Sequence, residues 1–349
     1  MKKIVFSSLG VAAMIFSAAL TSCEKDDKDK SDGKAVYATG YFTSNNVSGA
    51  KILKNGEVYA VHSSVSFGMS VFVSGDVSYI VGYRRTSTAD NAMLWKYDNV
   101  NMANIGQTRV LSNNYSEARS VFVSGDDIYI AGYEKQTVSG VSKDVAILWK
   151  NNNAQSLVTG QWTDGMALSV FVSDGDVYVA GYQGSVAPGV RPENIATLWK
   201  NGEAQNLTDG TKSARANSVY VVGDNVYVAG YESNAQNLGV AKLWKNGVEQ
   251  ILASPATANS VFVSGNDVYV AGSDGGAPTL WKNGVAQKLA EWGDAYSVYV
   301  DGNDVYVGGN VRHGTYELEA MIWKNGEAYQ HPLDNGNSKQ SSIRSVFVK

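Results

Sequence analysis

Cysteine and histidine are scarce in this chain of 349 residues, and both scarcities limit what the protein can be. The only cysteine is Cys23, so no disulfide within the chain can stabilise the fold. The three histidines, His62, His313 and His331, lack the spacing of metal ligands. We therefore expect no metal site and no cofactor, and we expect packing of the chain itself to provide the stability.

Basic charge is also limited. The chain has 29 Lys and Arg against 33 Asp and Glu, a net charge of −4. These residues form no basic stripe of the kind that nucleic-acid binding requires, so nucleic acid is not an expected partner. No Gly-x-Ser-x-Gly motif precedes a helix, and no helix is expected. The sequence therefore indicates no catalytic residue.

The longest apolar stretch stands at the N-terminus. Two lysines precede a run of apolar and small residues from Ile4 to Leu20, and Cys23 follows shortly after it. This order is typical of a signal peptide, and the placement of the cysteine resembles the bacterial lipoprotein box. The resemblance implies that residues 1–22 are removed and that lipid, including a palmitate chain, is attached to Cys23. A plain secretory signal or a short transmembrane helix is the alternative.

The next segment is strongly charged. Residues 24–33 contain no apolar side chain, which predicts a disordered acidic tether over 23–33, counting the lipidated cysteine. A short acidic run after such a cysteine resembles the surface-export signal of Bacteroidetes lipoproteins. The resemblance implies a lipid anchor in the outer membrane and a domain that faces the cell exterior.

One phrase then recurs seven times: Ser-Val-Phe-Val, a tight turn, and Val-Tyr-Val-Ala-Gly-Tyr, with variations. The copies begin at Ser70, Ser120, Ser169, Ser218, Ser260, Ser297 and Ser345. A second phrase, Leu-Trp-Lys-Asn-Gly with variations, follows each copy except the last. Repeats of about 40–50 residues that contain only strand patterns are typical of propeller blades.

Residues 218–252 show how one repeat forms a blade. Strands are predicted at 218–222, 226–231, 240–245 and 248–252, where β-branched and aromatic residues gather. Asn246-Gly247 between the last two strands is a strong hairpin signal. The strands are apolar on both faces, as expected for blades that stack face to face.

The sequence therefore predicts an all-β fold over residues 34–349, a seven-bladed β-propeller of four-stranded antiparallel blades. The first repeat begins with Val36–Tyr41 and lacks its Ser-Val-Phe-Val strand, whereas Ser345–Lys349 supplies that strand alone. We expect the C-terminal strand to pair beside Val36–Tyr41 in the first blade and to close the ring.

The layout resembles the WD-repeat and kelch propellers, although the motifs of those families are absent. A closer resemblance, on the two repeated phrases, is to uncharacterised repeat lipoproteins of Bacteroidetes. It covers residues 34–349 and implies the fold without an activity, since propellers host many functions. The repeated tryptophans are expected to pack between blades. The repeated serines are expected to tie neighbouring blades by hydrogen bonds, and the repeated glycines to allow a bulge or a close contact.

Function is expected where the repeats differ. The loops before the first strand and after the second strand vary in length, and both fall on one face of the array. The predicted ligand-binding residues on that face are Trp162, Trp292, Arg119, Arg344, Asn217, Asn259 and Tyr296. The last five precede repeated serines and are expected to surround the mouth of a central channel. Such a mixture suits a polar or anionic ligand such as a glycan, and the alternative is that these residues plug the channel.

Three functions fit these observations. The first is a non-enzymatic binding module for a glycan or an envelope protein. The second is a polysaccharide-active enzyme, a glycosidase or a lyase, with a site at the channel mouth. Its carboxylates would come from Glu117, Asp164, Glu193, Asp209, Glu291 and Asp294. The third is a structural component of an envelope complex, which a broad apolar patch would favour.

Overall fold

The computed structural model describes residues 34–44, 47–61, 65–104, 108–138, 140–158, 163–185, 193–314, 317–330 and 340–349. The predicted signal peptide over 1–22 and the tether over 23–33 lie outside the described residues. Residues 34–349 form one compact unit. Over the described ranges every regular element is a β-strand, and no helix is long and apolar enough to cross a membrane.

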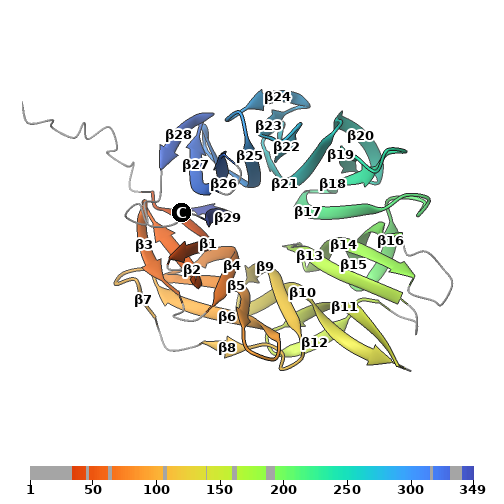
Figure 1. Cartoon of the computed structure of the whole chain (residues 1–349), viewed down its shortest axis with the longest axis horizontal. Helices are drawn as coiled ribbons and strands as arrows, with labels where there is room; N and C mark the ends of the chain where they lie inside the picture. Colours follow the sequence, from red (N-terminus) through yellow and green to blue (C-terminus); the bar gives the residue numbers. More distant parts are fainter. Residues whose placement is uncertain are drawn as a thin grey trace, which may run out of the picture. The chain divides into compact units, whose positions relative to one another are not determined.

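Each repeat contributes strands in a fixed order. The inner strands, which carry the repeated serines, are β4 (Ser66–Ser74), β9 (Ser116–Ser124), β13 (Thr163–Ser173), β17 (Ala214–Val222), β21 (Ala256–Ser264), β25 (Gly293–Asp301) and β29 (Gln340–Val348). The second strands are β1 (Val36–Ser44), β5 (Val77–Arg85), β10 (Asp127–Val138), β14 (Asp176–Ser185), β18 (Asn225–Ser233), β22 (Asp267–Asp274) and β26 (Asp304–His313). In Figure 1 the inner strands lie nearest the middle of the unit.

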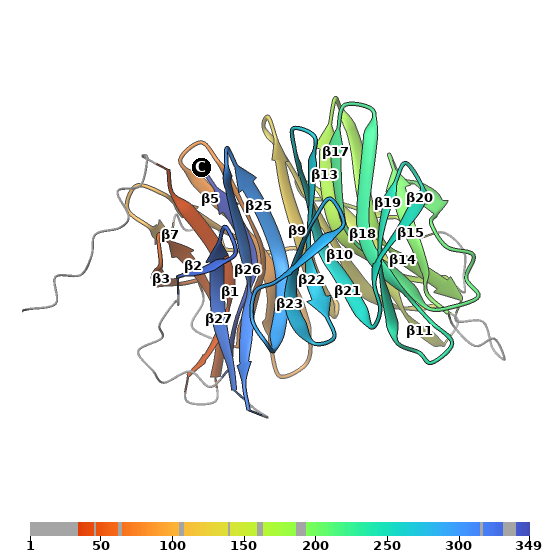
Figure 2. The same ribbon diagram turned by 90° about the horizontal axis from the view of Figure 1, so that it is seen from above.

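The remaining strands lie farther out. The third strands are β2 (Val47–Lys54), β6 (Asp90–Asp98), β11 (Val141–Lys150), β15 (Ile195–Lys200), β19 (Gly239–Lys245), β23 (Ala277–Lys282) and β27 (Glu317–Lys324). The outer strands are β3 (Glu57–Ala60), β7 (Ala103–Asn104), β8 (Arg109–Val110), β12 (Asn153–Ser156), β16 (Glu203–Asn206), β20 (Val248–Ala253), β24 (Val285–Lys288) and β28 (Glu327–Gln330). Figure 2 shows the strands running between two ends of the unit, with connecting loops at both ends.

Hydrogen bonding divides the strands into blades, and it corrects the predicted number. Four antiparallel sheets of four strands are β9–β12, β13–β16, β17–β20 and β21–β24, and β4–β8 form a fifth sheet. The other eight strands form one sheet in the order β25-β26-β27-β29-β1-β2-β3, with β28 on β27. The predicted seven separate blades are therefore wrong, because the described strands make five separate blades and one eight-stranded sheet.

The physical reason for this merger lies between β27 and β29. Leu318 and Gln340 pair in a parallel bridge, and the backbone N–H of Ala320 donates to the Ser341 hydroxyl at 2.9 Å. The strand that completes the first repeat is thus also hydrogen-bonded to the last repeat. Those two repeats form a continuous sheet, which the repeated phrases alone do not reveal.

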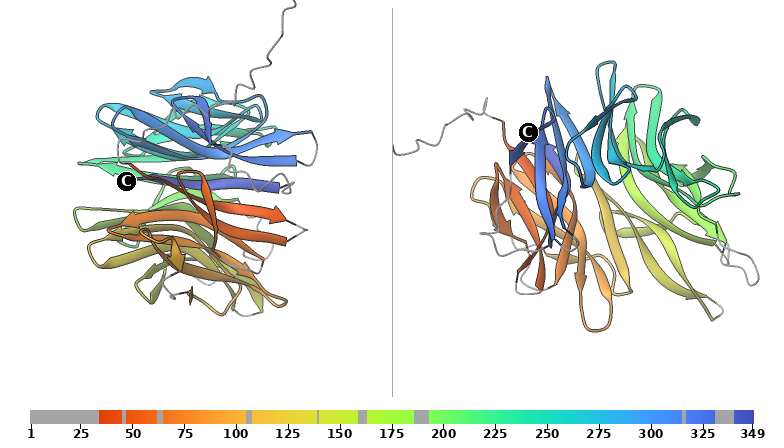
Figure 3. Two further views of the ribbon diagram at one scale, coloured as in Figure 1. Left: turned by 90° about the vertical axis from the view of Figure 1, so that its left-hand side faces the viewer. Right: turned by 45° about the horizontal axis from the view of Figure 1, so that its top comes forward.

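The predicted pairing of the C-terminal strand is confirmed. In β29, Val346 lies opposite Ala38 and Phe347 lies opposite Tyr37 of β1. Ala35 and Lys349 also exchange backbone hydrogen bonds of 2.6 and 3.0 Å. Figure 3 shows this last strand beside the first strands of the unit. Strand β29, at the end of the described chain, therefore belongs to the same sheet as β1, at its beginning.

The inner strands contact one another around a common axis through an aromatic belt. Its members are Phe72, Phe122, Phe171, Tyr220, Phe262, Tyr299 and Phe347, one from each inner strand. The centroids of neighbouring side-chain rings are 4.6–5.0 Å apart. The series is closed, because Phe347 contacts both Tyr299 and Phe72. Apolar side chains therefore surround the axis of this β-propeller at one level.

The repeated serines and tryptophans have the structural roles that the sequence predicts. Each serine hydroxyl accepts a backbone N–H from the next inner strand at 3.1–3.3 Å, as Ser169 does from Val219. The six repeated tryptophans are almost completely buried, and Trp244 belongs to an apolar cluster that also contains Val219 of its own sheet and Ala180 of the neighbouring sheet. The serine hydrogen bonds and the buried tryptophans thus hold neighbouring sheets together.

Asparagine turns fix the ends of the second strands. Asn246 and Gly247 both have positive φ, of 51° and 82°, as the predicted type I′ turn requires. The Asn246 side-chain oxygen also accepts the backbone N–H of Val226 at 2.8 Å. The same bond recurs at Asn55, Asn151, Asn201, Asn283 and Asn325. The asparagine therefore links the third hairpin turn to the second strand in six repeats.

Candidate functional site

Every inner strand carries a β-bulge at the residue before its repeated serine. In β9, Ala118 pairs with Gly132 and Ser120 pairs with Ala131, so Arg119 has no partner in the register. The same register shift leaves Met69, Leu168, Asn217, Asn259, Tyr296 and Arg344 unpaired. We call these seven half-buried residues the bulge ring. A bulge re-aims a side chain, and bulges are common beside functional sites.

A glycine opposite each bulge makes this geometry possible. A Cβ atom on Gly230 would lie 2.0 Å from the carbonyl oxygen of Arg215, which no side chain could tolerate. The equivalent distances at Gly40, Gly82, Gly132, Gly181, Gly272 and Gly309 are 1.8–2.1 Å. The prediction that the repeated glycines allow a bulge or a close contact is confirmed.

Arg344 is the bulge-ring residue with the most distinctive surroundings. Its guanidinium carbon lies 4.0 Å from the ring centroid of Tyr296 and 5.6 Å from that of Tyr41. Its Nε is buried without a hydrogen-bond partner, and no carboxylate of the described residues forms an ion pair with it. Stacking on two aromatic rings orients a guanidinium while leaving its edge free to donate. Arg344 is thus a pre-oriented cation without a neutralising partner.

Tyr296 helps to keep Arg344 in this state. Its hydroxyl donates to the Asp294 carboxylate at 3.1 Å, so this carboxylate of β25 accepts from a neutral donor. The phenol is already protonated at neutral pH with its ordinary pKa of 10.0, and burial raises the pKa of Tyr296 further. On the neighbouring strand β26, the Asn310 amide donates to the hydroxyl of Ser342, which stands two residues before Arg344 on β29, at 3.3 Å.

Arg119 differs from Arg344 because it is neutralised within the protein. Its guanidinium forms an ion pair with Glu117, which stands two residues earlier on β9 and is buried. Burial, followed by the charge of Glu117, raises the pKa of Tyr133, which lies opposite Glu117 on β10. The pair therefore keeps Arg119 in place and reduces its capacity to hold an external anion.

Asn217 and Asn259 make contacts that the sequence did not predict. The Asn217 amide donates to the carbonyl oxygen of Ala258, and the Asn259 amide donates to that of Ala295, both at 2.9 Å. Each bond joins one inner strand to the next. These amides therefore stabilise the bulge ring, whatever contacts they make with a ligand.

The two predicted tryptophans are placed differently. Trp162 lies outside the described residues, as does Cys23. Trp292 is 57% exposed and stands over the turn at Gly276, where an added Cβ would lie 3.2 Å from the indole. A shallow cavity of about 470 Å³ is lined by residues 288–292. Trp292 therefore offers a flat apolar face on the loop that leads into β25.

Aromatic side chains from three strands extend the site from Arg344. Phe67 of β4 stacks on Tyr83 of β5 with centroids 4.7 Å apart, and it meets Tyr41 of β1 edge-on at 5.2 Å. Burial raises the pKa of Tyr83 to about 12. Tyr41 and Tyr83 both belong to the repeated Gly-Tyr step, which is the sequence signal for this platform.

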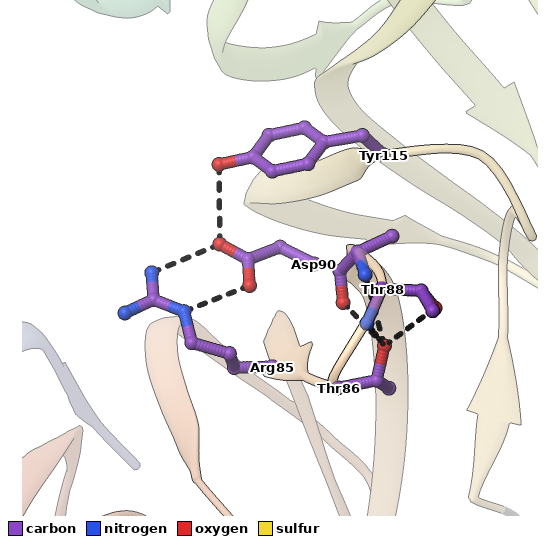
Figure 4. Close-up of polar contacts among 6 residues, drawn as sticks. Arg85, Thr86, Thr88, Asp90 and Tyr115 are labelled. Carbon is purple, nitrogen blue, oxygen red and sulfur yellow. Dashed lines mark hydrogen bonds and ion pairs between the residues drawn. The ribbon is translucent and has the colours of Figure 1, made fainter.

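A polar cluster beside this platform holds the loops in place (Figure 4). Arg85 donates from Nε and Nη2 to both oxygens of Asp90, at 2.9 and 3.0 Å. The Tyr115 hydroxyl donates to the same carboxylate at 3.2 Å. Arg85 and Asp90 were not among the predicted site residues, because a spacing of five residues across a hairpin loop is not distinctive. Arg85 is neutralised by this bidentate pair.

Four of the six candidate carboxylates are held by other groups of the protein. Glu117 is paired with Arg119, Asp294 accepts from Tyr296, and Asp209 accepts from Thr211 in an exposed turn. Asp164 accepts the backbone N–H of Asp144 at 2.6 Å, and burial raises its pKa. No group of three side chains that could hold a metal ion occurs in the described ranges.

No protein-family model and no curated protein matches the sequence. Similar solved structures include the β-propeller domain of the trilobed protease from Pyrococcus furiosus, with a TM-score of 0.53 and 12% identity over 88% of this chain and 94% of that chain. Another is the uncomplexed acylaminoacyl peptidase of Pyrococcus horikoshii, with a TM-score of 0.52 and 13% identity over 87% of this chain.

The chain spans about half the length of that peptidase, since 51% of it is covered. At these identities the likeness shows the β-propeller fold alone, because propellers carry unrelated functions. The Pyrococcus furiosus domain has an open velcro topology. In the present chain, by contrast, β29 pairs with β1.

Proposed function

We propose that this chain is a lipid-anchored, non-enzymatic binding module that recognises an anionic glycan through the bulge ring. The observation that carries the proposal is Arg344, stacked on Tyr296 and Tyr41 with a buried, unpartnered Nε and no described carboxylate to neutralise it. An unsatisfied buried donor on a cation is costly, so a native protein that keeps one calls for an explanation. A bound anion provides that explanation.

A sugar carboxylate or sulfate fits this site better than a simple anion does. A guanidinium binds a planar carboxylate through two parallel hydrogen bonds. The faces of sugar rings carry C–H groups that pack on aromatic side chains, and Tyr41, Phe67 and Tyr83 form such a platform next to Arg344. Trp292 supplies another exposed face on the loop that precedes Tyr296.

The proposal includes the location of the protein. Lipid attachment at Cys23, an outer-membrane anchor and an outward-facing domain are inferred from the order of the N-terminal residues. Metabolic labelling with radioactive palmitate tests the anchor, with Cys23→Ala as the unlabelled control. Protease treatment of intact cells tests the orientation, because an outward-facing domain is digested and a periplasmic one is protected.

The test of recognition is an array of neutral, carboxylated and sulfated polysaccharides probed with the full chain and with Arg344→Gln. Arg84→Gln is the control, because Arg84 also has a buried, unpartnered Nε but lacks an aromatic ring beneath it among the described contacts. We expect charged glycans to bind the wild type and the control, and binding to Arg344→Gln to be lost. Equal binding by all three proteins would contradict the role of Arg344.

Recognition of an envelope protein is the second candidate, and exposed apolar residues on two outer strands favour it. Val248 and Ile251 of β20 are 73% and 61% exposed, and Val285 of β24 is 73% exposed. Outer strands have a free backbone edge that can pair with another chain. Val248→Lys with Val285→Lys would abolish pull-down of an envelope partner in this case, while leaving glycan binding unchanged.

An enzymatic function has less support. The aromatic belt places apolar side chains around the axis, and the candidate carboxylates are engaged separately. Hydrolysis of a glycosidic bond needs two carboxyl groups that flank one bond. Release of reducing ends from a glycan that binds the chain would establish this function instead.

A further inference from the structure

Arg215 shares the properties that distinguish Arg344. Its guanidinium carbon lies 4.8 Å from the ring centroid of Tyr182, on the neighbouring blade. Its Nε is buried without a hydrogen-bond partner, and no carboxylate among the described residues is ion-paired with it. Arg215 was not a predicted site residue, because it stands two positions before the bulge at Asn217.

The other arginines near this face show that the arrangement is specific. Arg85 is held by both oxygens of Asp90, and Arg119 is paired with Glu117. Arg84 and Arg119 also have a buried, unpartnered Nε, but neither has an aromatic ring beneath it in the described contacts. Only Arg215 and Arg344, of the arginines in the described ranges, combine an aromatic support with a buried, unpartnered Nε.

The two arginines stand on inner strands that lie far apart around the axis. The aromatic belt places the inner strands around the axis in the order β29, β4, β9, β13, β17, β21 and β25. Arg344 on β29 and Arg215 on β17 are therefore separated by β4, β9 and β13 in one direction and by β21 and β25 in the other. A single small anion cannot be expected to reach both.

Tyr182 gives Arg215 a stable support. The Tyr182 side chain is buried, and burial raises its pKa to about 12, so the phenol is neutral at physiological pH. A neutral aromatic face attracts a guanidinium without neutralising it. The Arg215 charge is consequently available to a ligand, as that of Arg344 is.

We propose that Arg215 on Tyr182 is a second anion-binding subsite, and that the ligand is an acidic oligosaccharide with at least two separated anionic groups that spans the bulge ring. This inference rests on the proposed function of Arg344. The chemistry at both subsites is the same, a guanidinium that donates to a carboxylate or sulfate on a sugar. Between the subsites on one side, the bulge-ring positions are Met69, Arg119 and Leu168, which can contact uncharged parts of the sugar chain.

The experiment is calorimetric titration of the full chain with hexagalacturonate, with galacturonate monomer and with the methyl ester of the hexamer. A dextran sulfate hexasaccharide distinguishes sulfate from carboxylate recognition. The variants are Arg215→Gln, Arg344→Gln and Arg84→Gln, and thermal unfolding followed by circular dichroism checks that each is folded.

We expect Arg215→Gln to lower the affinity for the charged hexamers about tenfold and to leave binding of the monomer unchanged. Arg344→Gln should lower the affinity for both, whereas Arg84→Gln should change neither. If Arg215→Gln binds the hexamers as tightly as Arg84→Gln does while Arg344→Gln is impaired, the second subsite is refuted and the proposed function stands. If the wild type binds no charged probe, the proposed function and this inference both fail.

Discussion

The side-chain rings of Phe347 and Phe72 lie 5.0 Å apart, although the two residues stand near opposite ends of the described chain. Between the same two strands, the Ser345 hydroxyl accepts the backbone N–H of Val71 at 3.2 Å. These contacts close the aromatic belt and the series of serine hydrogen bonds. The last strand therefore connects both to β1 within its sheet and to β4, the next inner strand around the axis.

Removal of residues 345–349 should destabilise the unit strongly. The deletion takes away the pairing of Ser345–Val348 with Val36–Thr39 of β1, the Phe347 contacts and the Ser345 hydrogen bond, and it exposes a new sheet edge there. We expect the melting temperature to fall by about 10 °C or more, measured by circular dichroism. Lys349→Ala is the matched control, and an unchanged melting temperature in the deletion would contradict closure by β29.

Substitution at a glycine opposite a bulge should be far more harmful than substitution in a turn. Gly230→Ala places a Cβ 2.0 Å from the Arg215 carbonyl oxygen, so the strands must separate. We expect a loss of about 3 kcal/mol or more in the free energy of unfolding by urea. Gly223→Asn is the control, because Gly223 has a φ of 52° and nothing within 4 Å of an added Cβ. Equal stability of the two variants would show that the bulge is not required.

The aromatic belt should tolerate tyrosine but not alanine. Phe122→Ala removes contacts to Phe72 and Phe171, and the loss should be about 2 kcal/mol, below the range for a fully buried phenylalanine. Phe122→Tyr should cost little, because Tyr220 and Tyr299 occupy the same position on other inner strands. Chemical denaturation measures both, and a neutral alanine variant would refute a stabilising belt.

Acid should weaken a repeated ion-pair network at the turns. Hydrogen bonds from Lys150, Lys200 and Lys282 lower the pKa of the aspartates that they contact below the ordinary 3.8. Since the folded-state pKa is depressed, the stabilisation is present above 3.8 and is lost as pH falls through the lower folded value.

The variant that tests this prediction replaces Asp127, Asp176 and Asp267 by asparagine. Its stability should decline less steeply than that of the wild type as pH falls below 3.8, because three of the titrating groups are gone. All three carboxylates are exposed, so the effect is expected to be small. Identical pH profiles for the two proteins would contradict a contribution from these pairs.

Much of the fold could be predicted because the repeat makes each local signal occur many times. The Asn246-Gly247 turn and the pairing of β29 with β1 follow from residues that repeat or are conspicuously missing. The number of separate blades could not be predicted. The bridge between Leu318 and Gln340 joins segments outside the repeated phrases, and a single parallel pairing leaves no periodic trace.

The candidate site was only partly predictable for a related reason. The position before each serine could be recognised as variable, and it is the bulge position in the structure. Whether an arginine there is neutralised depends on its neighbours in space. Glu117 stands two residues before Arg119, whereas Ser342 occupies the corresponding position before Arg344, and the aromatic support comes from Tyr296 on another strand.

A crystal structure of the full chain with a charged oligosaccharide that it binds tests the central claim most directly. The account predicts an anionic group within hydrogen-bond distance of the Arg344 guanidinium, with a sugar face against Tyr41 or Phe67. A ligand bound on the outer strands, or at the end of the unit where the turns between first and second strands lie, with no contact to Arg344, would contradict it.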